Sequence, residues 1–400
     1  GNQALPDSLL RSQVKLSRGD PFNRYAIENG ILDILDLYAD TGYLEAAVER
    51  EIDINIEARI AMVDLTVKER AQSTVAEIRI TGNEKTNQSV VTRELSFHEG
   101  EIVDYAELMA SQRRLYLTGL VESVLIRPEF VDESDSTKQQ IHVDLIETLS
   151  CEFFGSLGYG SVEKVRGRVV FSSTNVAGTP RTLGATAEAS AIRQALTLSG
   201  TEPRTLGSRF QTDINVFGVL QQEPGYDLDK YGGSIAVGKD IWDNGHVSLR
   251  YRLENGTLTD VKTDEIPEDF KPRVRSLIVT ISDDSRNDLF DPSRGMFLEL
   301  TAELAGGFLK GTNSFGRIIT RGKRFFPIGR RTVLASSLTI GWMDDFGLSD
   351  EIPLNERFYA GGPTVLRSFE YQKAGPLDAG GDPLGGKFKI TFHPTGIAAL

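Results

Sequence analysis

Alternating hydrophobic and polar positions dominate the chain from residue 151 onward. In the segment 246–253 the odd-numbered positions are apolar (Val247, Leu249, Tyr251 and Leu253) and the even-numbered positions are polar. The segments 209–220 and 298–304 alternate in the same way. Because successive side chains of a strand point to opposite faces, this period predicts strands with one apolar and one polar face. We expect about twelve such strands between Glu152 and Phe392, joined by turn-rich links at 283–295 and 344–355.

The length of these strands and the charge on their polar faces separate two all-β architectures. Several segments run for ten or more residues, as a strand that crosses a membrane needs, whereas soluble sheets use about five or six. Charged inner-face residues are costly in the dry core of a sandwich and cheap in a wet lumen. Aromatic residues near strand ends are typical of an interfacial girdle; they are Phe325, Phe326, Trp342 and Phe346. The pattern favours a transmembrane antiparallel barrel over a soluble sandwich.

The first 150 residues contain a diverged repeat with a helical pattern. The segment 9–42 resembles the segment 90–119, with Gly19 corresponding to Gly100 and Gly42 to Gly119. In each copy we expect a short helix that ends at the first glycine, then a second helix. Strands are expected at 59–67, 75–80, 120–131 and 141–145, so the second copy has the order βααββ. The leading strand of the first copy is expected before residue 1, in a longer protein.

Each βααββ copy predicts a three-stranded sheet with an exposed edge, backed by two helices. Exposed edges recruit extended peptides by adding a strand, so the copies are candidate peptide-holding modules. Ordinary α+β spacer domains are the alternative.

The acidic charge of the chain lies in this repeat region. Residues 1–150 carry 27 acidic and 15 basic side chains, a net charge of −12, and residues 151–400 carry 30 and 29, a net charge of −1. Because phosphate binding needs a basic stripe, nucleic acid is not expected as a partner. The single cysteine, Cys151, rules out an intramolecular disulfide and is interpreted as an inert residue.

No chemistry typical of a catalyst is visible in the sequence. The four histidines, His98, His142, His246 and His393, show no metal-ligand spacing. Neither a Gly-x-Ser-x-Gly elbow nor a Walker-type phosphate loop occurs. We therefore expect no catalytic residue, no metal and no cofactor, and the protein is not predicted to be an enzyme.

Two segments are specific enough to indicate a family. The first, 282–295, reads SDDSRNDLFDPSRG and precedes an alternating strand at 296–304. The second and more specific, 355–371, reads NERFYAGGPTVLRSFEY. Together they resemble the BamA/TamA superfamily of outer-membrane assembly and secretion barrels, and the βααββ repeats resemble its POTRA domains. The resemblance covers essentially the whole chain.

The resemblance implies a sixteen-stranded barrel after the POTRA domains, of which about twelve strands are present here. It also implies a loop between the eleventh and twelfth strands that folds into the lumen and packs on the inner wall. The residues of this lumen-loop motif are Arg357, Phe358, Gly361, Gly362, Arg367 and Phe369. Ser368 stands where the family usually has glycine, and the acidic partner of the motif arginine is expected beyond Leu400.

The chemistry of Arg367 also suggests a role in fixing the loop, independently of the resemblance. Its permanently charged, planar guanidinium could pin a loop that dips into a polar lumen. A solvated loop arginine is the alternative. The residues Asp291, Pro292, Arg294 and Gly295 are interpreted as a structural turn before a strand.

Glycine is frequent in the first strand region, 153–160, at Gly155, Gly158 and Gly160. Glycine weakens a strand and allows close backbone approach. The resemblance places this strand at the seam where the barrel closes, so a weak seam could open sideways and accept a client strand. An ordinary glycine-rich strand that fits a tight lumen is the alternative.

These expectations combine into three domains: a POTRA domain at 1–70 without its first strand, a POTRA domain at 71–150, and a barrel at 151–400 without its C-terminal strands. The resemblance implies an assembly factor that inserts unfolded barrel clients into the outer membrane. A two-partner secretion transporter for one dedicated substrate is the alternative. The expected partners are unfolded outer-membrane or secreted proteins, outer-membrane lipid, and periplasmic or inner-membrane accessory proteins. The expected location is the bacterial outer membrane, with the POTRA domains in the periplasm.

Overall fold

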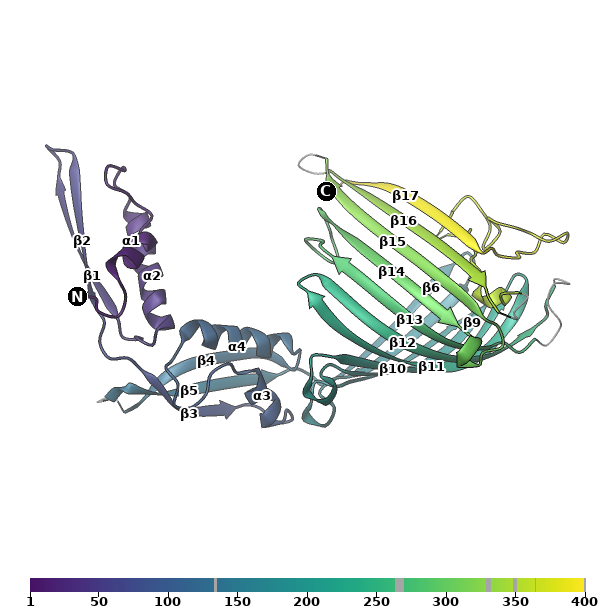
Figure 1. Cartoon of the computed structure of the whole chain (residues 1–400), viewed down its shortest axis with the longest axis horizontal. Coiled ribbons are helices and arrows are strands. Elements are labelled where there is room, and N and C mark those ends of the chain that lie inside the picture. The colour runs from purple at the N-terminus through teal and green to yellow at the C-terminus, as the bar shows by residue number, and fades with distance from the viewer. Residues whose placement is uncertain (133–134, 263–269, 329–331, 348–350, 364, 399–400) are drawn as a thin grey trace. The chain divides into compact units, whose positions relative to one another are not determined.

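The computed structural model describes residues 1–132, 135–262, 270–328, 332–347, 351–363 and 365–398, and the chain divides into two compact units. Unit 1 comprises Gly1–Ser150 and Asn175–Pro180, and unit 2 comprises Cys151–Thr174 and Arg181–Leu400. The helices and strands of unit 1 are α1 (Asp7–Gln13), α2 (Arg24–Asp40), β1 (Ala47–Asn55), β2 (Ile60–Lys68), β3 (Thr74–Thr81), α3 (Gln88–Glu94), α4 (Tyr105–Leu117), β4 (Val121–Asp132) and β5 (Asp135–Glu147) (Figure 1).

The second repeat has the predicted order βααββ. Its sheet has the strand order β3-β5-β4, with β3 parallel and β4 antiparallel to β5. Hydrophobic side chains of the sheet and of α3 and α4 form one buried core that includes Val75, Leu108, Ile141 and Val143. α4 begins after Asp104, whose carboxylate accepts a hydrogen bond from the Glu107 amide at 3.1 Å and so caps the helix.

The prediction that the short helices end at Gly19 and Gly100 is wrong. α1 ends at Gln13 and α3 ends at Glu94. After α3, Leu95 and Phe97 are both buried, and extended backbone is what points residues two apart into the same core. Gly19 and Gly100 take positive φ angles of 101° and 89° in the turns that follow. The helical spacing therefore stops one turn to two turns earlier than the glycines suggest.

β1 was missed by the sequence analysis. It pairs antiparallel with β2 over its whole length, and most of its side chains are exposed. Charged residues such as Glu49, Glu51 and Asp53 have low strand propensity. Pairing with β2 therefore overrides the local preference of the segment.

Glu147, at the end of β5, fastens the loop before α3. Its carboxylate accepts hydrogen bonds from the backbone amides of Lys85 (3.0 Å) and Thr86 (2.7 Å). Burial alone would raise the pKa of Glu147, but the hydrogen bonds from Thr86 and Lys85 favour the charged form and lower the pKa below its usual value. The contact is therefore strongest while Glu147 is ionised.

Unit 2 is one twelve-stranded antiparallel sheet in which every strand pairs with its neighbours in sequence. Its strands are β6 (Cys151–Gly160), β7 (Lys164–Ser173), β8 (Thr182–Ser190), β9 (Arg193–Glu202), β10 (Gln211–Glu223), β11 (Tyr226–Trp242), β12 (Gly245–Thr259), β13 (Arg273–Asp284), β14 (Gly295–Ala305), β15 (Phe315–Pro327), β16 (Thr332–Asp345) and β17 (Phe388–Ala398). The sheet curls strongly, and β6 and β17 are its two edges within the described residues (Figure 1). The expectation of about twelve strands is confirmed.

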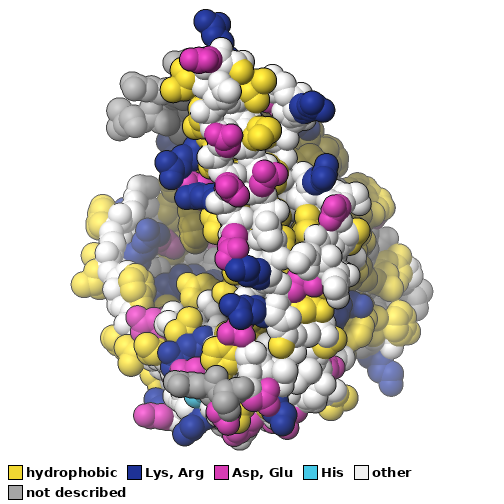
Figure 2. Space-filling view, turned by 90° about the vertical axis from the view of Figure 1, so that its left-hand side faces the viewer, with side chains coloured by type: hydrophobic (Ala, Val, Ile, Leu, Met, Phe, Trp, Pro, Cys, Tyr) yellow, Lys and Arg dark blue, Asp and Glu magenta, His cyan; other side chains and the backbone are white. Residues whose placement is uncertain are grey.

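The two faces of this sheet differ as the alternation predicts. Leu249, Leu253, Leu298 and Leu300 are exposed on one face. The other face, called the inner face below, carries buried charged residues such as Glu254 and Glu303. Figure 2 shows hydrophobic, acidic and basic side chains interspersed over the face in view. The sheet is therefore apolar outside and polar inside.

The last strand is longer than predicted. The sequence analysis ended it at Phe392, but β17 continues through His393 and Pro394, and Pro394 lies opposite Ser336 of β16. Proline lacks an amide hydrogen and is tolerated on an edge strand, where one side needs no ladder bonds. β17 is such an edge within the described residues.

Candidate functional site

The segment 346–387, called the lumen loop below, connects β16 to β17 and packs against the inner face. It lies between the eleventh and twelfth strands of the sheet, as predicted. Its two arms join where Phe358 and Gly386 exchange backbone hydrogen bonds of 3.0 and 2.9 Å. The Phe358 ring packs against a buried cluster from four strands and the loop; the cluster contains Val274, Ala305, Phe315, Met343 and Ile352. A Cβ atom at Gly341 would lie 2.6 Å from this ring, so glycine there makes room for it.

Glu356 anchors the lumen loop to the sheet through a buried charged cluster. Its carboxylate accepts hydrogen bonds from Arg317 of β15 at 2.9 Å and from Arg252 of β12 at 3.2 Å. Both arginines also bond Glu303 of β14, Arg252 at 2.6 Å and Arg317 through Nε at 2.9 Å. The Glu356 side chain is only 4% exposed. The charged cluster therefore consists of Arg252, Glu303, Arg317 and Glu356, with two positive and two negative charges.

Two neighbouring residues extend the cluster without changing its balance. Glu254 of β12 pairs with Arg252 at 3.4 Å and with Lys230 of β11 at 3.4 Å. Buried charges are tolerated when each is paired and hydrogen-bonded, and removal of one partner then leaves an uncompensated charge. The cluster therefore fixes the loop in one place on the inner face.

The sequence analysis missed Glu356 as a functional residue. Arg252 and Glu303 lie at polar positions of alternating strands, so their place on the inner face follows from the pattern. Glu356 precedes the predicted motif residue Arg357 by one position, but its partners come from strands more than 35 residues away in sequence. No local pattern shows such a pairing.

The predicted motif residues near Glu356 have structural roles. Arg357 is 13% exposed, and its guanidinium donates hydrogen bonds to the carbonyls of Ile352 (2.9 Å) and Leu384 (3.1 Å). Gly361 and Gly362 take φ angles of 108° and 99°, which glycine adopts without strain. A Cβ atom at Gly361 would lie 2.3 Å from the Glu370 carbonyl oxygen. These residues shape the reversal of the loop.

Arg367 and Phe369 lie apart from the charged cluster. Both are exposed, and the Arg367 guanidinium donates a hydrogen bond to the Pro363 carbonyl at 3.3 Å. Among the described residues this is its only side-chain hydrogen bond. Thr364, within the same segment, lies outside the described residues. A pinning role for Arg367 therefore stays a prediction, while Glu356 is the residue that holds the loop here.

The turn between β13 and β14 contains the predicted residues Asp291, Pro292, Arg294 and Gly295. Its hydrogen bonds come mainly from Asn287, whose side-chain oxygen accepts from the Ser293 and Arg294 amides at 3.0 and 2.9 Å. Gly295 has a φ of 98°, and a Cβ atom there would lie 2.2 Å from the Ser285 carbonyl oxygen. Asp291 and Arg294 are exposed. The turn thus brings no second charged cluster together in the described structure.

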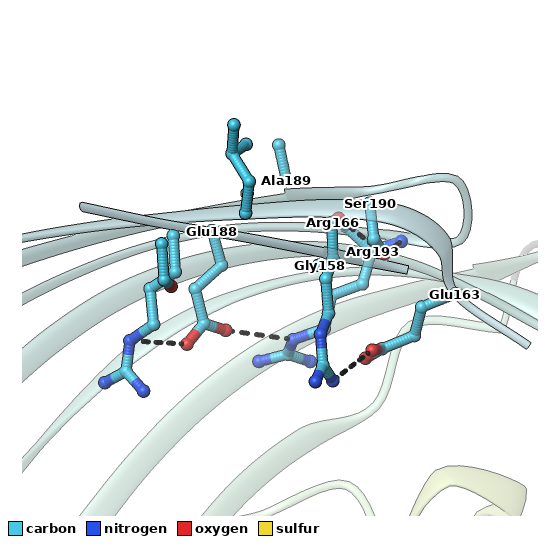
Figure 3. A pocket seen from close by; sticks show the side chains of 11 residues that line it. Gly158, Glu163, Arg166, Glu188, Ala189, Ser190 and Arg193 are labelled. Atoms are coloured by element: carbon cyan, nitrogen blue, oxygen red, sulfur yellow. Dashed lines mark hydrogen bonds and ion pairs between the residues drawn. The ribbon is translucent and has the colours of Figure 1, made fainter. Parts of the chain in front are cut away.

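β6 carries the three predicted seam glycines and pairs with β7. A Cβ atom at Gly158 would lie 3.1 Å from the Arg166 Nε, while nothing lies within 4 Å of one at Gly155 or Gly160. Gly158 helps to line a pocket of about 350 Å³ with charged residues of β7, β8 and the turns. Figure 3 shows Glu163, Arg166, Glu188 and Arg193 on one side of the ribbon, joined by ion pairs. Gly158 therefore leaves room for a charged side chain, a role that glycine content alone did not predict.

The described residues offer little for a metal ion or a membrane-spanning helix. They contain no group of three or more His, Cys, Asp or Glu side chains placed to hold a metal ion. None of the helices in the described ranges is long and apolar enough to cross a membrane. Cys151, at the start of β6, is a free and exposed thiol.

Comparison with protein families gives two matches. The Omp85 superfamily domain matches residues 175–393. The POTRA family, described as a surface antigen variable number repeat, matches residues 1–70 and 73–147.

Several named proteins are similar to this chain. The outer membrane protein assembly factor BamA of Nitratidesulfovibrio vulgaris is 24% identical over 396 residues, which are 95% of this chain and 49% of that protein. BamA of Neisseria meningitidis is 24% identical over 400 residues, covering 93% of this chain and 49% of that protein. A sorting and assembly machinery component 50 homolog of Xenopus tropicalis is 31% identical over 180 residues, 44% of this chain and 38% of that protein. The chain thus spans about half the length of the curated BamA relatives it matches.

A solved structure shares the fold. The crystal structure of BamA from Haemophilus ducreyi lacking POTRA domains 1–3 superposes with a TM-score of 0.87 at 20% sequence identity. The match covers 98% of this chain and 80% of that one. The βααββ repeats and the curled sheet are therefore the architecture of a POTRA-plus-barrel protein.

Proposed function

The chain belongs to the Omp85 superfamily, and from this premise we propose that it acts as an outer-membrane protein assembly factor. In this proposal the POTRA repeats hold unfolded barrel clients, and the barrel inserts them into the outer membrane through a lateral seam at β6. The protein is an outer-membrane protein whose POTRA repeats lie in the periplasm. The proposed domain division is a POTRA domain at 1–70, a POTRA domain at 71–150 and the barrel at 151–400.

The observation that carries the proposal is the combination, in one chain, of βααββ repeats with a barrel sheet whose inner face holds an anchored loop. The relatives that cover nearly all of this chain are named as outer membrane protein assembly factors. A barrel that only conducts solutes needs no peptide-holding repeats. Assembly uses both parts.

The repeats are suited to hold extended segments. In the second repeat β3 and β4 are the edges of a three-stranded sheet. An extended peptide can add to such an edge through backbone hydrogen bonds, with little demand on its sequence. We expect unfolded outer-membrane proteins to be the clients, because barrel strands are extended and apolar on one face.

Several features of β6 favour a seam at this strand. It is an edge of the sheet in the described residues, it contains three strand glycines, and its side chains Phe153, Leu157 and Tyr159 are highly exposed. No ion pair among the described side chains joins β6 to β7. A client strand could therefore pair with β6 once the seam parts. Outer-membrane lipid and accessory proteins at the repeats complete the proposed set of partners.

The proposed mechanism involves no covalent step. Because the energy of insertion comes from the folding of the client itself, the barrel needs only to present a free strand edge to the client and to lower the activation barrier to membrane insertion. No catalytic residue, metal or cofactor is part of the proposal.

The test is a client-folding assay with the protein at its natural full length in liposomes. A urea-denatured barrel that is unrelated to this chain is added, and its folding is followed by gel mobility. We expect clearly faster folding than in empty liposomes, and slower folding with Arg367→Ala if the loop motif takes part. No acceleration, together with export of one dedicated substrate through the pore, would replace the proposal with a two-partner secretion transporter.

A further inference from the structure

The far part of the lumen loop makes a second contact with the sheet, away from the charged cluster. The Gln372 side chain donates a hydrogen bond to the carboxylate of Glu223, the last residue of β10, at 2.8 Å. Gln372 itself has a φ of 62°, which is uncommon for a residue other than glycine and persists only where the surroundings hold it. The loop is therefore held to β10 at a defined point.

A row of polar side chains continues from this point across the inner face. The Gln221 side chain donates to Glu223 and accepts from Arg193 of β9 at 2.5 Å. Gln221 and Glu223 are two apart on one strand, so their side chains share a face. The contact of the loop with β10 thereby reaches β9.

The row then crosses to β7, the neighbour of β6. Arg193 pairs with Glu188 of β8 at 3.7 Å, and Glu188 pairs with Arg168 of β7 at 3.4 Å. Arg168 lies directly opposite Ser156 of β6. Figure 3 shows Glu188 and Arg193 on the same side of the sheet, joined by a dashed line.

Arg193 occupies the central position in this row. One end of its guanidinium bonds Gln221 and its Nε faces Glu188. The planar fork of arginine offers donors in two directions at once, which the single ammonium of lysine does not. No other side chain in the row touches partners on both sides of β9.

We propose that this row couples the lumen loop to the seam, with Arg193 and Glu188 as positioning residues. With the row intact, β7 is tied through β8 and β9 to β10 and the loop, so that β6 alone can part from the sheet. When Gln372 leaves Glu223, the row loses its end point and β7 loosens together with β6. The inference rests on the proposed function, because it explains how a loop inside the barrel controls a seam four strands from its contact on β10.

The decisive variant is Gln372→Ala, because this side chain touches β10 and is far from β6 along the sheet. If Arg193 had only a local structural role, loss of Gln372 would leave β6 and β7 unchanged. In a coupled row, it loosens β7 together with β6 as much as Arg193→Gln does. Energetic coupling is shown by non-additivity of the two changes.

The experiment is amide hydrogen exchange on the protein at natural full length in lipid nanodiscs, without any client. The variants are Gln372→Ala, Arg193→Gln, and the double variant. The control is Arg181→Gln, which removes an ion pair with Glu202 between the same strands at their other end, outside the row. Each single variant is expected to speed exchange in residues 151–173 about three- to tenfold, as loss of one or two hydrogen bonds allows. The double variant is expected to add little, and the control to leave these amides unchanged.

Unchanged exchange at 151–173 in Gln372→Ala, or strictly additive effects in the double variant, would overturn the coupling. If Arg193→Gln fails to insert, Glu188→Gln tests the same link from β8. Because no client is present, a negative result leaves the assembly proposal intact. Conversely, if hydrogen exchange shows the coupling but the client-folding assay shows no acceleration, the assembly proposal is contradicted and the coupling through the row is not.

Discussion

The second repeat of unit 1 and the sheet of unit 2 place their hydrophobic residues on opposite sides. In the repeat, Leu108, Ile141 and Val143 are fully buried. In the sheet, Leu249 and Leu300 are 51% and 43% exposed, while Glu303 and Glu356 are buried. The repeat therefore has an apolar interior and a polar surface, whereas the sheet has a polar inner face and an apolar outer face.

The difference shows which interaction stabilises each region. The repeat gains its stability from burying apolar surface away from water, as soluble domains do. The outer face of the sheet meets lipid, so its apolar residues are satisfied without being covered by protein. Specific order inside the sheet then comes from the backbone ladder and from paired charges on the inner face, which also help to hold the lumen loop.

The largest expected effect is in the core of the repeat. Ile141→Ala should destabilise the second repeat by about 3–4 kcal/mol, because Ile141 is fully buried and leaves a cavity. Limited proteolysis of the region 71–150 across a urea series measures the midpoint. The control is Ile146→Ala, on the same strand at a 60% exposed position, where a shift of similar size would contradict the assigned core.

The next effect compares the outer and the inner face of the sheet at two adjacent residues of β14. Leu300→Lys should cost about 2–4 kcal/mol if Leu300 faces lipid. Thr301→Lys, on the inner face, should cost less than about 1 kcal/mol. Urea unfolding in liposomes, followed by gel mobility, measures both. Equal costs would mean that the two faces meet the same surroundings, contrary to the barrel.

The charged cluster should matter more to the loop than to the sheet. Glu356→Gln keeps the shape of the side chain but weakens its charged hydrogen bonds to Arg252 and Arg317, and should weaken the loop anchor by about 2 kcal/mol. The measurement is the rate of protease cleavage within 346–387. Glu370→Gln is the matched control, because Glu370 is an exposed carboxylate on the same loop. Equal cleavage of the two variants would remove Glu356 from its anchoring role.

The smallest expected effect is the pH dependence of the repeat. The pKa of Glu147 is lower in the folded repeat than in the unfolded chain, so its stabilisation is complete above the unfolded pKa of about 4.3. It is lost as the pH falls through the lower folded pKa, and amounts to about 1 kcal/mol. Urea midpoints of the repeat between about pH 3 and pH 6 should therefore fall more steeply for the natural protein than for Glu147→Gln. Parallel profiles would contradict the sign.

The sequence predicts secondary structure best where apolar and polar residues alternate with a short, regular period. Alternation along 246–253 and 298–304 is a property of each strand alone, so the number of strands follows without knowledge of pairing. The place of the lumen loop is what the family resemblance implies. The predicted end of α3 is wrong because burial of Leu95 and Phe97 decides it, and burial belongs to the folded core. Strand β1 was missed for the same reason, since β2 supplies its partner.

The candidate site is harder to predict than the fold. Arg357, Phe358 and the two glycines of the loop were found because they belong to one continuous motif. Glu356 and Arg193 act through partners that the sheet brings together from distant parts of the chain. Only the three-dimensional register of β7 to β15 reveals those pairs.

Site-specific cross-linking shows whether clients enter through β6. Leu157→Cys on β6 and Leu249→Cys on β12 are made in a Cys151→Ser background, both at exposed outer positions. A barrel client with one cysteine in its last strand is allowed to fold through the full-length protein under mild oxidation. We expect a disulfide to position 157 during folding and none to position 249. Faster client folding with no cross-link at 157, or with equal cross-linking at both positions, would contradict entry at β6.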